Sequence, residues 1–226
     1  MTPARLLAIQ TGPVAPLGPD GVPSGFVKSP RRGPVRVGLL GLEGDAQADL
    51  RVHGGPEKAV YGYAASHYPE WRAEFPEHAA LLIGGGVGEN LTIAGMDESD
   101  INVGDIHAIG SALLQVCQIR QPCFKFALRF GDSRLPRAMV RNGRSGWYYR
   151  VLEPGVIQPD DAVALHDRPN PDFGLARFAA IVYRNNATLA ELERLADMAG
   201  LASQWQARTR KALGDTAQLN PNREFP

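Results

Sequence analysis

Short hydrophobic runs separated by turn residues fill the first three quarters of the chain. The runs ARLLAIQT, PVRVGLL and ENLTIAG each predict a β-strand, and Leu91 and Ile93 share one face of the third. The run DIHAIGSALLQVCQI predicts a hairpin that turns at Gly110 and Ser111, and GWYYRVLEPGVI predicts another strand pair around Pro154. Many short strands between turns favour a mainly β fold, either a barrel or a folded sandwich.

Helical spacing interrupts the predicted strands twice. Residues 66–75 predict one helix, because Pro69 would fall in its first turn, where proline is tolerated. Residues 135–141 predict a second, shorter helix that stops at Asn142 and Gly143. Neither segment is long enough to change the mainly β assignment.

The hydrophobic period becomes helical near residue 168. Residues 173–183 predict one helix, and a second begins at a cap supplied by Asn186 or Thr188 and ends at Gly200. A third helix is predicted over 203–214, and the tail after Ala217 is expected to fray. The predicted division of the chain is a β domain, residues 1–167, followed by a small three-helix region, residues 168–226.

Composition removes several classes of protein. Lys and Arg number 24 and Asp and Glu number 24, so the net charge is zero, which argues against bulk attraction to nucleic acid or to anionic membranes. Two cysteines are too few for a disulfide framework, a four-cysteine zinc ribbon or an iron–sulfur cluster held by four thiolates. The sequence shows no signal-peptide architecture and no run near the roughly 18 apolar residues of a membrane span. We therefore expect a cytoplasmic protein.

Two glycine-rich segments are candidates for a binding site. In LEGDAQADLRVHGGPEKAVYGY, the two glycines after His53 would let the backbone approach a ligand and offer N–H groups to an anion. The alternative is a loop of turn formers with a surface histidine. The second segment, GGGVGEN, is neither a dinucleotide fingerprint nor a P-loop, but it would serve as a flexible loop before a strand that lines a site. The five histidines show no zinc spacing, and no G-x-S-x-G elbow is present.

The stretch RQPCFKF places one of the two cysteines between cations. Arg120 precedes Cys123 and Lys125 follows it, and nearby cations lower the pKa of a thiol by favouring the thiolate. A thiolate acts as a nucleophile or as a soft ligand for a soft metal. The alternative is a buried cysteine at the end of a strand, flanked by two solvated charges.

These segments together resemble one family. The runs GLEGDAQADLRVHGG, GENLT, VGDIHAIGSALLQVCQIRQPCFKF and GRSGWYYRVLEPGVI occur in the order found in the MOSC domain, the C-terminal domain of molybdenum cofactor sulfurases. The chain looks most like the bacterial subgroup described as 6-N-hydroxylaminopurine resistance proteins. The resemblance spans residues 5 to about 215 and includes the helical tail.

The resemblance implies a MOSC-type β-barrel that binds molybdopterin-bound molybdenum. The family's P-C-x-K/R cysteine, taken to ligate the metal or carry sulfur, falls on Cys123, whereas Cys117 matches no family cysteine and is expected to be a small buried residue. By motif position, His53 would donate a proton or bind a substrate oxygen, and Asn90 would hydrogen-bond the pterin. The other expected cofactor contacts are Arg51, Glu89, Arg120, Lys125 and Arg144.

The activity that the resemblance implies is reduction of N-hydroxylated bases and related N-hydroxy compounds. The chain has no flavin or nicotinamide fingerprint, so we expect an external reductase to supply the two electrons. An alternative is a protein that binds the molybdenum cofactor, or carries its sulfur, without turnover of its own. In either case we expect a monomer or homodimer.

A DNA-binding alternative rests on the last helices. The run LADMAGLASQWQARTRKAL resembles the turn of a helix-turn-helix, with Arg208, Arg210 and Lys211 on its final helix. Three cations are a small electrostatic footprint for DNA. A packing appendage with a solvated basic face is the simpler interpretation, and we expect no nucleic-acid partner.

Overall fold

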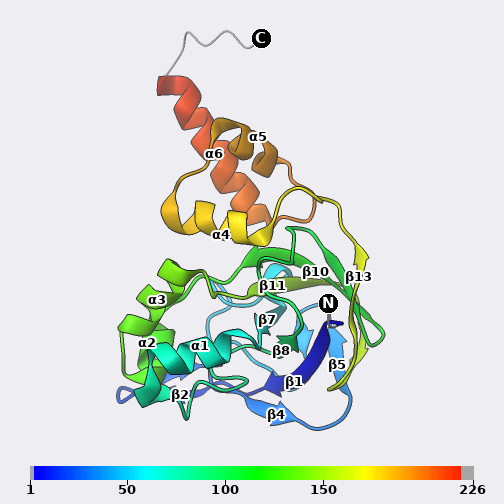
Figure 1. Ribbon diagram of the computed structural model, residues 1–226, viewed down its shortest axis with the longest axis vertical. Coiled ribbons are helices and arrows are strands. Elements are labelled where there is room, and N and C mark those ends of the chain that lie inside the picture. The colour runs from blue at the N-terminus through cyan, green and yellow to red at the C-terminus, as the bar shows by residue number, and fades with distance from the viewer. Residues whose placement is uncertain (1–2, 220–226) are drawn as a thin grey trace.

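A mixed sheet of eight strands dominates the computed structural model, which describes residues 3–219 (Figure 1). In spatial order its strands are β13 (Val163–Asp167), β9 (Ile106–Ile109), β10 (Ala112–Ile119), β11 (Trp147–Glu153), β7 (Val60–Ala64), β8 (Leu91–Ala94), β1 (Arg5–Thr11) and β4 (Ser29–Arg31). Two smaller sheets contain β12 (Gly155–Ile157), β5 (Val35–Gly38) and β6 (Gly41–Leu42), and β2 (Ala15–Leu17) and β3 (Val22–Ser24).

Six α-helices and two 3₁₀ turns complete the described part of the chain. They are η1 (Pro56–Lys58), α1 (His67–Glu74), η2 (Pro76–His78), α2 (Phe124–Phe130), α3 (Arg134–Asn142), α4 (Leu175–Arg184), α5 (Leu189–Ala196) and α6 (Ser203–Leu219). Helices α1 to α3 lie beside the sheet, whereas α4 to α6 stand above one end of it (Figure 1). No helix within residues 3–219 is both long and apolar enough to cross a membrane.

The strand pairing follows the hydrophobic pattern in most places. The predicted β9–β10 hairpin is confirmed, and its turn needs Gly110, which has a φ of +55° and whose Cβ would lie 2.3 Å from the carbonyl oxygen of Val156. Strands β7 and β8 are parallel, and α1 lies in the connection between them. The strand pair predicted around Pro154 is wrong in its partner, because β12 pairs with β5 rather than with β11.

The ends of the main sheet approach each other without forming a ladder. The Leu6 N–H donates to the carbonyl oxygen of Asp161 over 2.9 Å, and the Asp160 N–H donates to the Leu6 carbonyl over 2.7 Å. A single bridge joins Arg5 to Ala162, just before β13. Within residues 3–219 no continuous strand pairing closes the sheet. The predicted barrel is therefore not confirmed, and the fold is mixed and dominated by its sheets.

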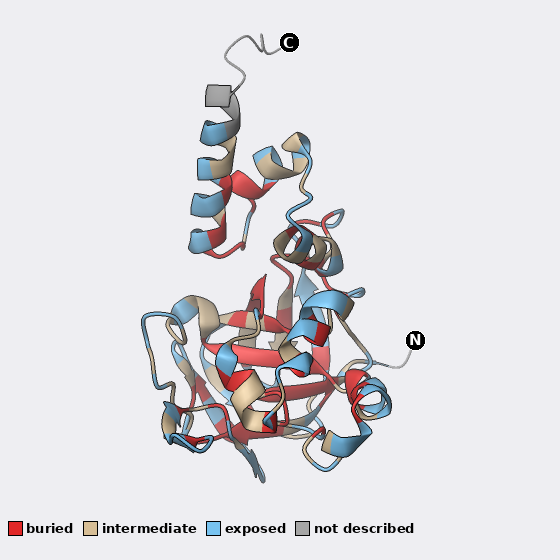
Figure 2. Ribbon diagram, turned by 90° about the vertical axis from the view of Figure 1, so that its left-hand side faces the viewer, coloured by how far each residue is buried: buried red, intermediate tan, exposed pale blue. Residues whose placement is uncertain are grey.

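Two hydrophobic cores divide the lower body of the molecule, where buried residues follow the strands (Figure 2). The larger core lies within the sheets and extends to the helical unit; it includes Trp147 and Tyr149, which are fully buried. The smaller core joins α1, α2 and α3 to β7, and its Trp71 and Phe126 are fully buried. The centroids of the Trp71 and Phe126 rings lie 6.4 Å apart in an edge-to-face contact. This contact packs α2, which directly follows Cys123, against α1.

The helical unit, α4 to α6, matches the change of period along the chain. Thr188 rather than Asn186 caps α5, in a reciprocal capping box with Glu191. The rings of Phe178 and Trp205 meet at 5.5 Å and pack α4 against α6. The predicted end of the third helix at Gly214 is wrong, because α6 continues to Leu219. The frayed tail predicted after Ala217 falls largely on residues 220–226, outside the described residues.

Helix α2 was not predicted. It begins directly after Cys123, which is extended with φ −114° and ψ 171°, and it ends at Gly131 in the left-handed conformation. The stretch RQPCFKF is therefore a strand end followed by a helix start, rather than a strand end alone.

Candidate functional site

A pocket with about 600 Å³ of empty space, part of it open to solvent, collects loops from distant parts of the chain. Four of its walls come from residues 24–28, 45–58, 88–90 and 120–125. Five residues predicted for the site line it: His53, Asn90, Arg120, Cys123 and Lys125. The motifs singled out in the sequence thus converge in space, although up to 72 positions separate their members.

Cys123 has the environment of a reactive thiol. Burial alone raises the pKa of its half-buried side chain. The hydrogen bond with His53, the charge of Arg120 and the backbone N–H of Lys125 outweigh burial and lower the pKa to about 7. Near neutral pH a large share of the side chain is therefore thiolate, the form that attacks electrophiles and binds soft metals.

Arg120 is buried in the wall of the same pocket, and its guanidinium lies against aromatic rings. The centroids of the Phe26, Tyr61 and Phe126 rings lie 5.4, 5.2 and 5.4 Å from its Cζ. Its Nη1 lies 3.6 Å from the sulfur of Met139, and no carboxylate of residues 3–219 forms an ion pair with it. A buried cation without a carboxylate partner is costly, so this guanidinium, which already favours the Cys123 thiolate, is suited to an anionic ligand in the pocket.

Three lysines add positive charge to the pocket wall. Lys28 forms a buried ion pair with Asp45, and burial lowers the pKa of Lys28. Lys125 donates to the carbonyl of Pro23 over 2.8 Å, and Lys58 donates to the carbonyl of Val52 over 2.7 Å. Each of these last two ammonium groups has further N–H donors for a ligand.

Asn90 lines the pocket but has little freedom to bind a ligand. Its Oδ1 accepts from the Tyr61 N–H over 3.1 Å. Its Nδ2 donates to the carbonyl of Gln10 over 3.1 Å and to Asp45 Oδ2 over 3.0 Å. Both amide protons are used, so the side chain fixes the pocket wall, and any bond to a pterin would have to use its remaining acceptor capacity.

Glu89 lies behind the wall and is not among the residues that line the pocket. It is fully buried, and its Oε1 accepts from Tyr68 over 2.6 Å, from the Gly85 N–H over 2.7 Å and from Thr92 over 2.9 Å. Burial raises the pKa of this carboxyl group. These contacts describe a structural support for the GGGVGEN loop, not a direct contact to a ligand in the pocket.

Two arginines predicted to bind the cofactor lie outside the pocket. Arg144 pairs with Glu70 at 2.6 Å and with Glu74 at 3.1 Å, and its guanidinium lies over Trp71. It lines a second pocket between α3 and α4 instead. Arg51 is exposed and its Nε donates to Asp49 Oδ1 over 3.0 Å. Nearby carboxylates hold both cations, which is why the structure does not bring them to Cys123.

Other residues of the pocket were missed by the sequence interpretation. Phe26, Tyr61 and Tyr148 supply its aromatic wall, and Lys28 with Asp45 supplies its buried ion pair. Asp45 and Tyr61 lie within the polar segment that drew attention to His53. Phe26, Lys28 and Tyr148 lie outside it, and pairing between distant segments decides which of them face the pocket.

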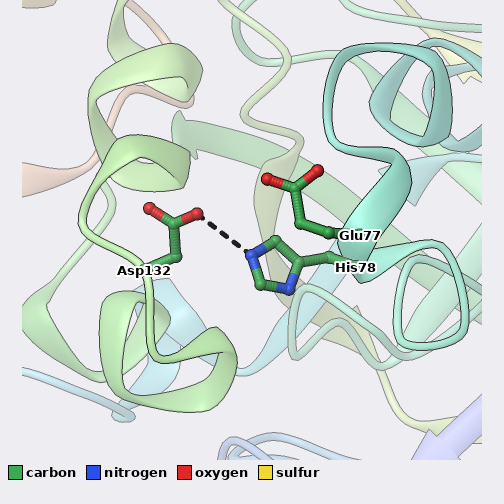
Figure 3. A group of neighbouring side chains, drawn as sticks. All are labelled: Glu77, His78 and Asp132. Atoms are coloured by element: carbon green, nitrogen blue, oxygen red, sulfur yellow. Dashed lines mark hydrogen bonds and ion pairs between the residues drawn. The ribbon is translucent and has the colours of Figure 1, made fainter.

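A separate cluster has the composition of a metal site. Glu77, His78 and Asp132 approach one another between η2 and α3, and His78 Nε2 lies 3.0 Å from Asp132 Oδ2 (Figure 3). Arg134 forms ion pairs with both carboxylates. The guanidinium already provides the cation at this position, so the cluster is an ion-pair network at the surface.

Comparison with known proteins identifies the family of the chain. The MOSC domain model matches residues 49–164, which contain His53, Arg120 and Cys123. The chain belongs to the MOSC domain family. Protein YiiM of Escherichia coli (strain K12) is 38% identical over 193 residues, which are 85% of this chain and 86% of that protein. The crystal structure of YiiM from Geobacillus stearothermophilus superposes with a TM-score of 0.78 at 31% identity, covering 93% of this chain and 100% of that one.

A longer fungal relative has a different organisation. A protein named "Reductase" from Gibberella moniliformis is 36% identical over 190 residues, which are 83% of this chain but only 34% of that protein. The region shared with this MOSC chain is thus one part of a much larger polypeptide.

Proposed function

We propose that the Cys123 pocket binds the molybdenum cofactor and that the protein reduces N-hydroxylated bases and related N-hydroxy compounds. One observation carries the proposal. A thiol with a pKa of about 7 lies beside a buried guanidinium that has no carboxylate partner within residues 3–219. This combination offers a soft anionic ligand and a site for an anionic group in the same pocket.

The donor set fits the cofactor. Cys123 would hold molybdenum, because thiolate sulfur suits soft metal centres. Arg120, Lys58 and Lys125 would neutralise the cofactor's phosphate and dithiolene groups. Gly55 has a φ of +78° and open space on its Cβ side, so the backbone after His53 leaves room for a ligand.

The reaction replaces an N–O bond by an N–H bond. A hydroxylamine R–NH–OH takes up two electrons and two protons and yields R–NH₂ and water. The bound cofactor would supply the two-electron chemistry. The residues of this chain would orient the substrate and move protons: His53, which lines the same pocket as Cys123, would deliver a proton to the leaving oxygen.

The electrons have to come from another protein. The chain carries no flavin or nicotinamide fingerprint, so we propose an external reductase as the donor. The fungal relative named "Reductase" supports this arrangement, because about two thirds of its length lies outside the shared region. In that protein the additional part would have room for a donor module in the same polypeptide.

Purified protein from a host that makes molybdopterin tests the proposal. We expect bound molybdenum and pterin, and turnover of an N-hydroxylated purine when a reduced dye supplies electrons. NADPH alone should give no turnover. Molybdenum without turnover would favour a protein that carries the cofactor or its sulfur. Protein that contains neither molybdenum nor pterin would overturn the proposal and leave only the family assignment.

A further inference from the structure

Glu57 connects the helical unit to the segment that carries His53. It lies in η1, four positions after His53, and its carboxylate accepts from the N–H of Ser203 over 2.8 Å and from the Ser203 hydroxyl over 2.9 Å. Ser203 is the first residue of α6, so a carboxylate from a distant segment caps this helix. Arg150 on β11 donates to the same carboxylate over 2.7 Å.

The main chain of Glu57 is held as well. Its carbonyl oxygen accepts from the Cys117 thiol over 3.1 Å and from Gln118 Nε2 over 2.8 Å. The Oε1 of Gln118 in turn accepts from Trp205 Nε1 over 3.1 Å, and Gln204 bonds the same oxygen. Both the side chain and the carbonyl of Glu57 are therefore tied, directly or through one residue, to the start of α6.

The segment between His53 and Glu57 turns through Gly54 and Gly55, which have φ values of +100° and +78°. Lys58, the residue after Glu57, holds this turn, because its N–H donates to the carbonyl of Gly55 over 3.1 Å and its Nζ donates to the carbonyl of Val52 over 2.7 Å. The N–H of His53 itself donates to the carbonyl of Asp49 over 2.8 Å, which is a bond within the same loop. The imidazole needs a fixed point outside the loop to stay at Cys123, and Glu57 is the nearest one along the chain.

We propose that Glu57 is a positioning residue through which the helical unit holds His53 against Cys123. The helical unit also contacts the segment that carries Cys123, because the hydroxyl of Tyr183 on α4 donates to the carbonyl of Arg120 over 2.7 Å. Helices α4 to α6 are then part of the support of the site. This inference concerns the protein without cofactor, so it stands or falls separately from the proposed reductase activity.

The test uses the metal-free full-length protein and a double-mutant cycle. His53→Gln identifies the imidazole NMR signals of His53 by their disappearance. The same variant gives the reference rate of Cys123 alkylation without the imidazole, measured at one fixed pH. Glu57→Ala should displace those signals and slow alkylation at least about threefold. In the His53→Gln background, Glu57→Ala should change the rate by less than about twofold, because both changes act through one contact.

A control and a milder variant keep the test decisive. Glu191→Gln is the control. The Glu191 carboxylate belongs to the same helical unit, but it pairs with Arg177 and does not contact the His53 segment. The His53 signals and the alkylation rate of Cys123 should therefore stay unchanged. Ser203→Ala removes one contact to Glu57 and should shift the His53 signals in the same direction as Glu57→Ala, by less. Unchanged His53 signals in both Glu57→Ala and Ser203→Ala, or equal slowing in the His53→Gln background, would overturn the proposal.

Discussion

The two cysteines of this MOSC protein lie six positions apart and have opposite chemistry. Cys117 is fully buried in β10, its thiol donates to the carbonyl of Glu57 over 3.1 Å, and burial raises its pKa to about 12. Cys123 is half-buried just beyond the end of the same strand, and its pKa is lowered to about 7. One thiol is a donor in the core, and the other lines an open pocket.

The difference lies in the partners of the two thiols rather than in burial alone. Burial raises the pKa in both places. Around Cys117 the acceptors are backbone carbonyls, which stabilise the protonated thiol. Around Cys123 the partners are His53, the charge of Arg120 and a backbone N–H, which stabilise the thiolate. A change of hydrogen-bonding polarity over six residues therefore separates a structural cysteine from a functional one.

The largest expected effect is the contrast in thiol reactivity. With pKa values of about 7 and about 12, the thiolate fractions at pH 7 differ by on the order of 10⁵. Iodoacetamide should therefore modify Cys123 with a half-maximal rate near pH 7, rising with pH because the thiolate is the reactive form. Cys117 should stay unmodified in the folded protein and react only after denaturation. Peptide mass spectrometry across pH 5 to 9 measures both, and equal labelling would break the comparison.

The substitution Cys123→Ser should have the next largest effect. A hydroxyl is a hard, weakly acidic group in place of a soft thiolate, so turnover of an N-hydroxylated purine should fall at least about 100-fold. The fold should survive because the change is nearly isosteric. Molybdenum content measured beside turnover separates loss of the ligand from loss of chemistry. Full metal content together with full turnover would show that Cys123 is not the ligand.

Arg120→Met removes the charge and keeps an unbranched side chain. Cofactor retained after purification should drop about tenfold or more, because Arg120 is a buried cation of the pocket that no carboxylate within residues 3–219 neutralises. Stability should change little, since replacing a buried charge by an apolar group of similar volume is often neutral. Arg144→Met is the matched control: its partners are Glu70 and Glu74, so cofactor retention should stay near that of the unmodified protein. Equal losses in both variants would contradict a specific role for Arg120.

Lys125→Ala should give a smaller loss of bound cofactor than Arg120→Met. Its ammonium group already donates to the Pro23 carbonyl and is one of three lysines in the pocket, so the other two would compensate in part. We expect about a threefold decrease in retained molybdenum at low salt, with the Cys123 ligand still present. If Lys125→Ala retained less molybdenum than Arg120→Met, Lys125 rather than Arg120 would be the more important cation for cofactor binding.

The sequence was most informative where local chemistry was unusual. Cations around Cys123 and glycines after His53 marked both residues as candidates, and the resemblance to the MOSC domain then assigned them to one site. The hairpin at Gly110 was predictable for the same reason, and the cap of α5 was narrowed to Asn186 or Thr188, since each feature needs a particular residue type at a fixed local position.

Long-range pairing set the limit of the prediction. Arg144 looked equivalent to Arg120 in sequence, but Glu70 and Glu74 on α1 meet it in space and occupy its guanidinium. Which arginine meets those carboxylates depends on how α1 and α3 pack, and no local pattern encodes this. The pairing of Lys28 with Asp45 and the contact of Glu57 with α6 depend on tertiary structure in the same way.

Cys117→Ser should have the smallest effect and defines the other side of the comparison. The serine hydroxyl can donate to the carbonyl of Glu57 as the thiol does, so the contact to η1 should persist. A hydroxyl is costlier to bury than a thiol, and Val116 and Ile119 are buried beside it, so we expect a loss of about 1 kcal/mol in the free energy of unfolding. Turnover and molybdenum content should match those of the unmodified protein. Denaturant unfolding beside the activity assay checks both, and a loss of activity without a loss of stability would show that the interior thiol takes part in the chemistry.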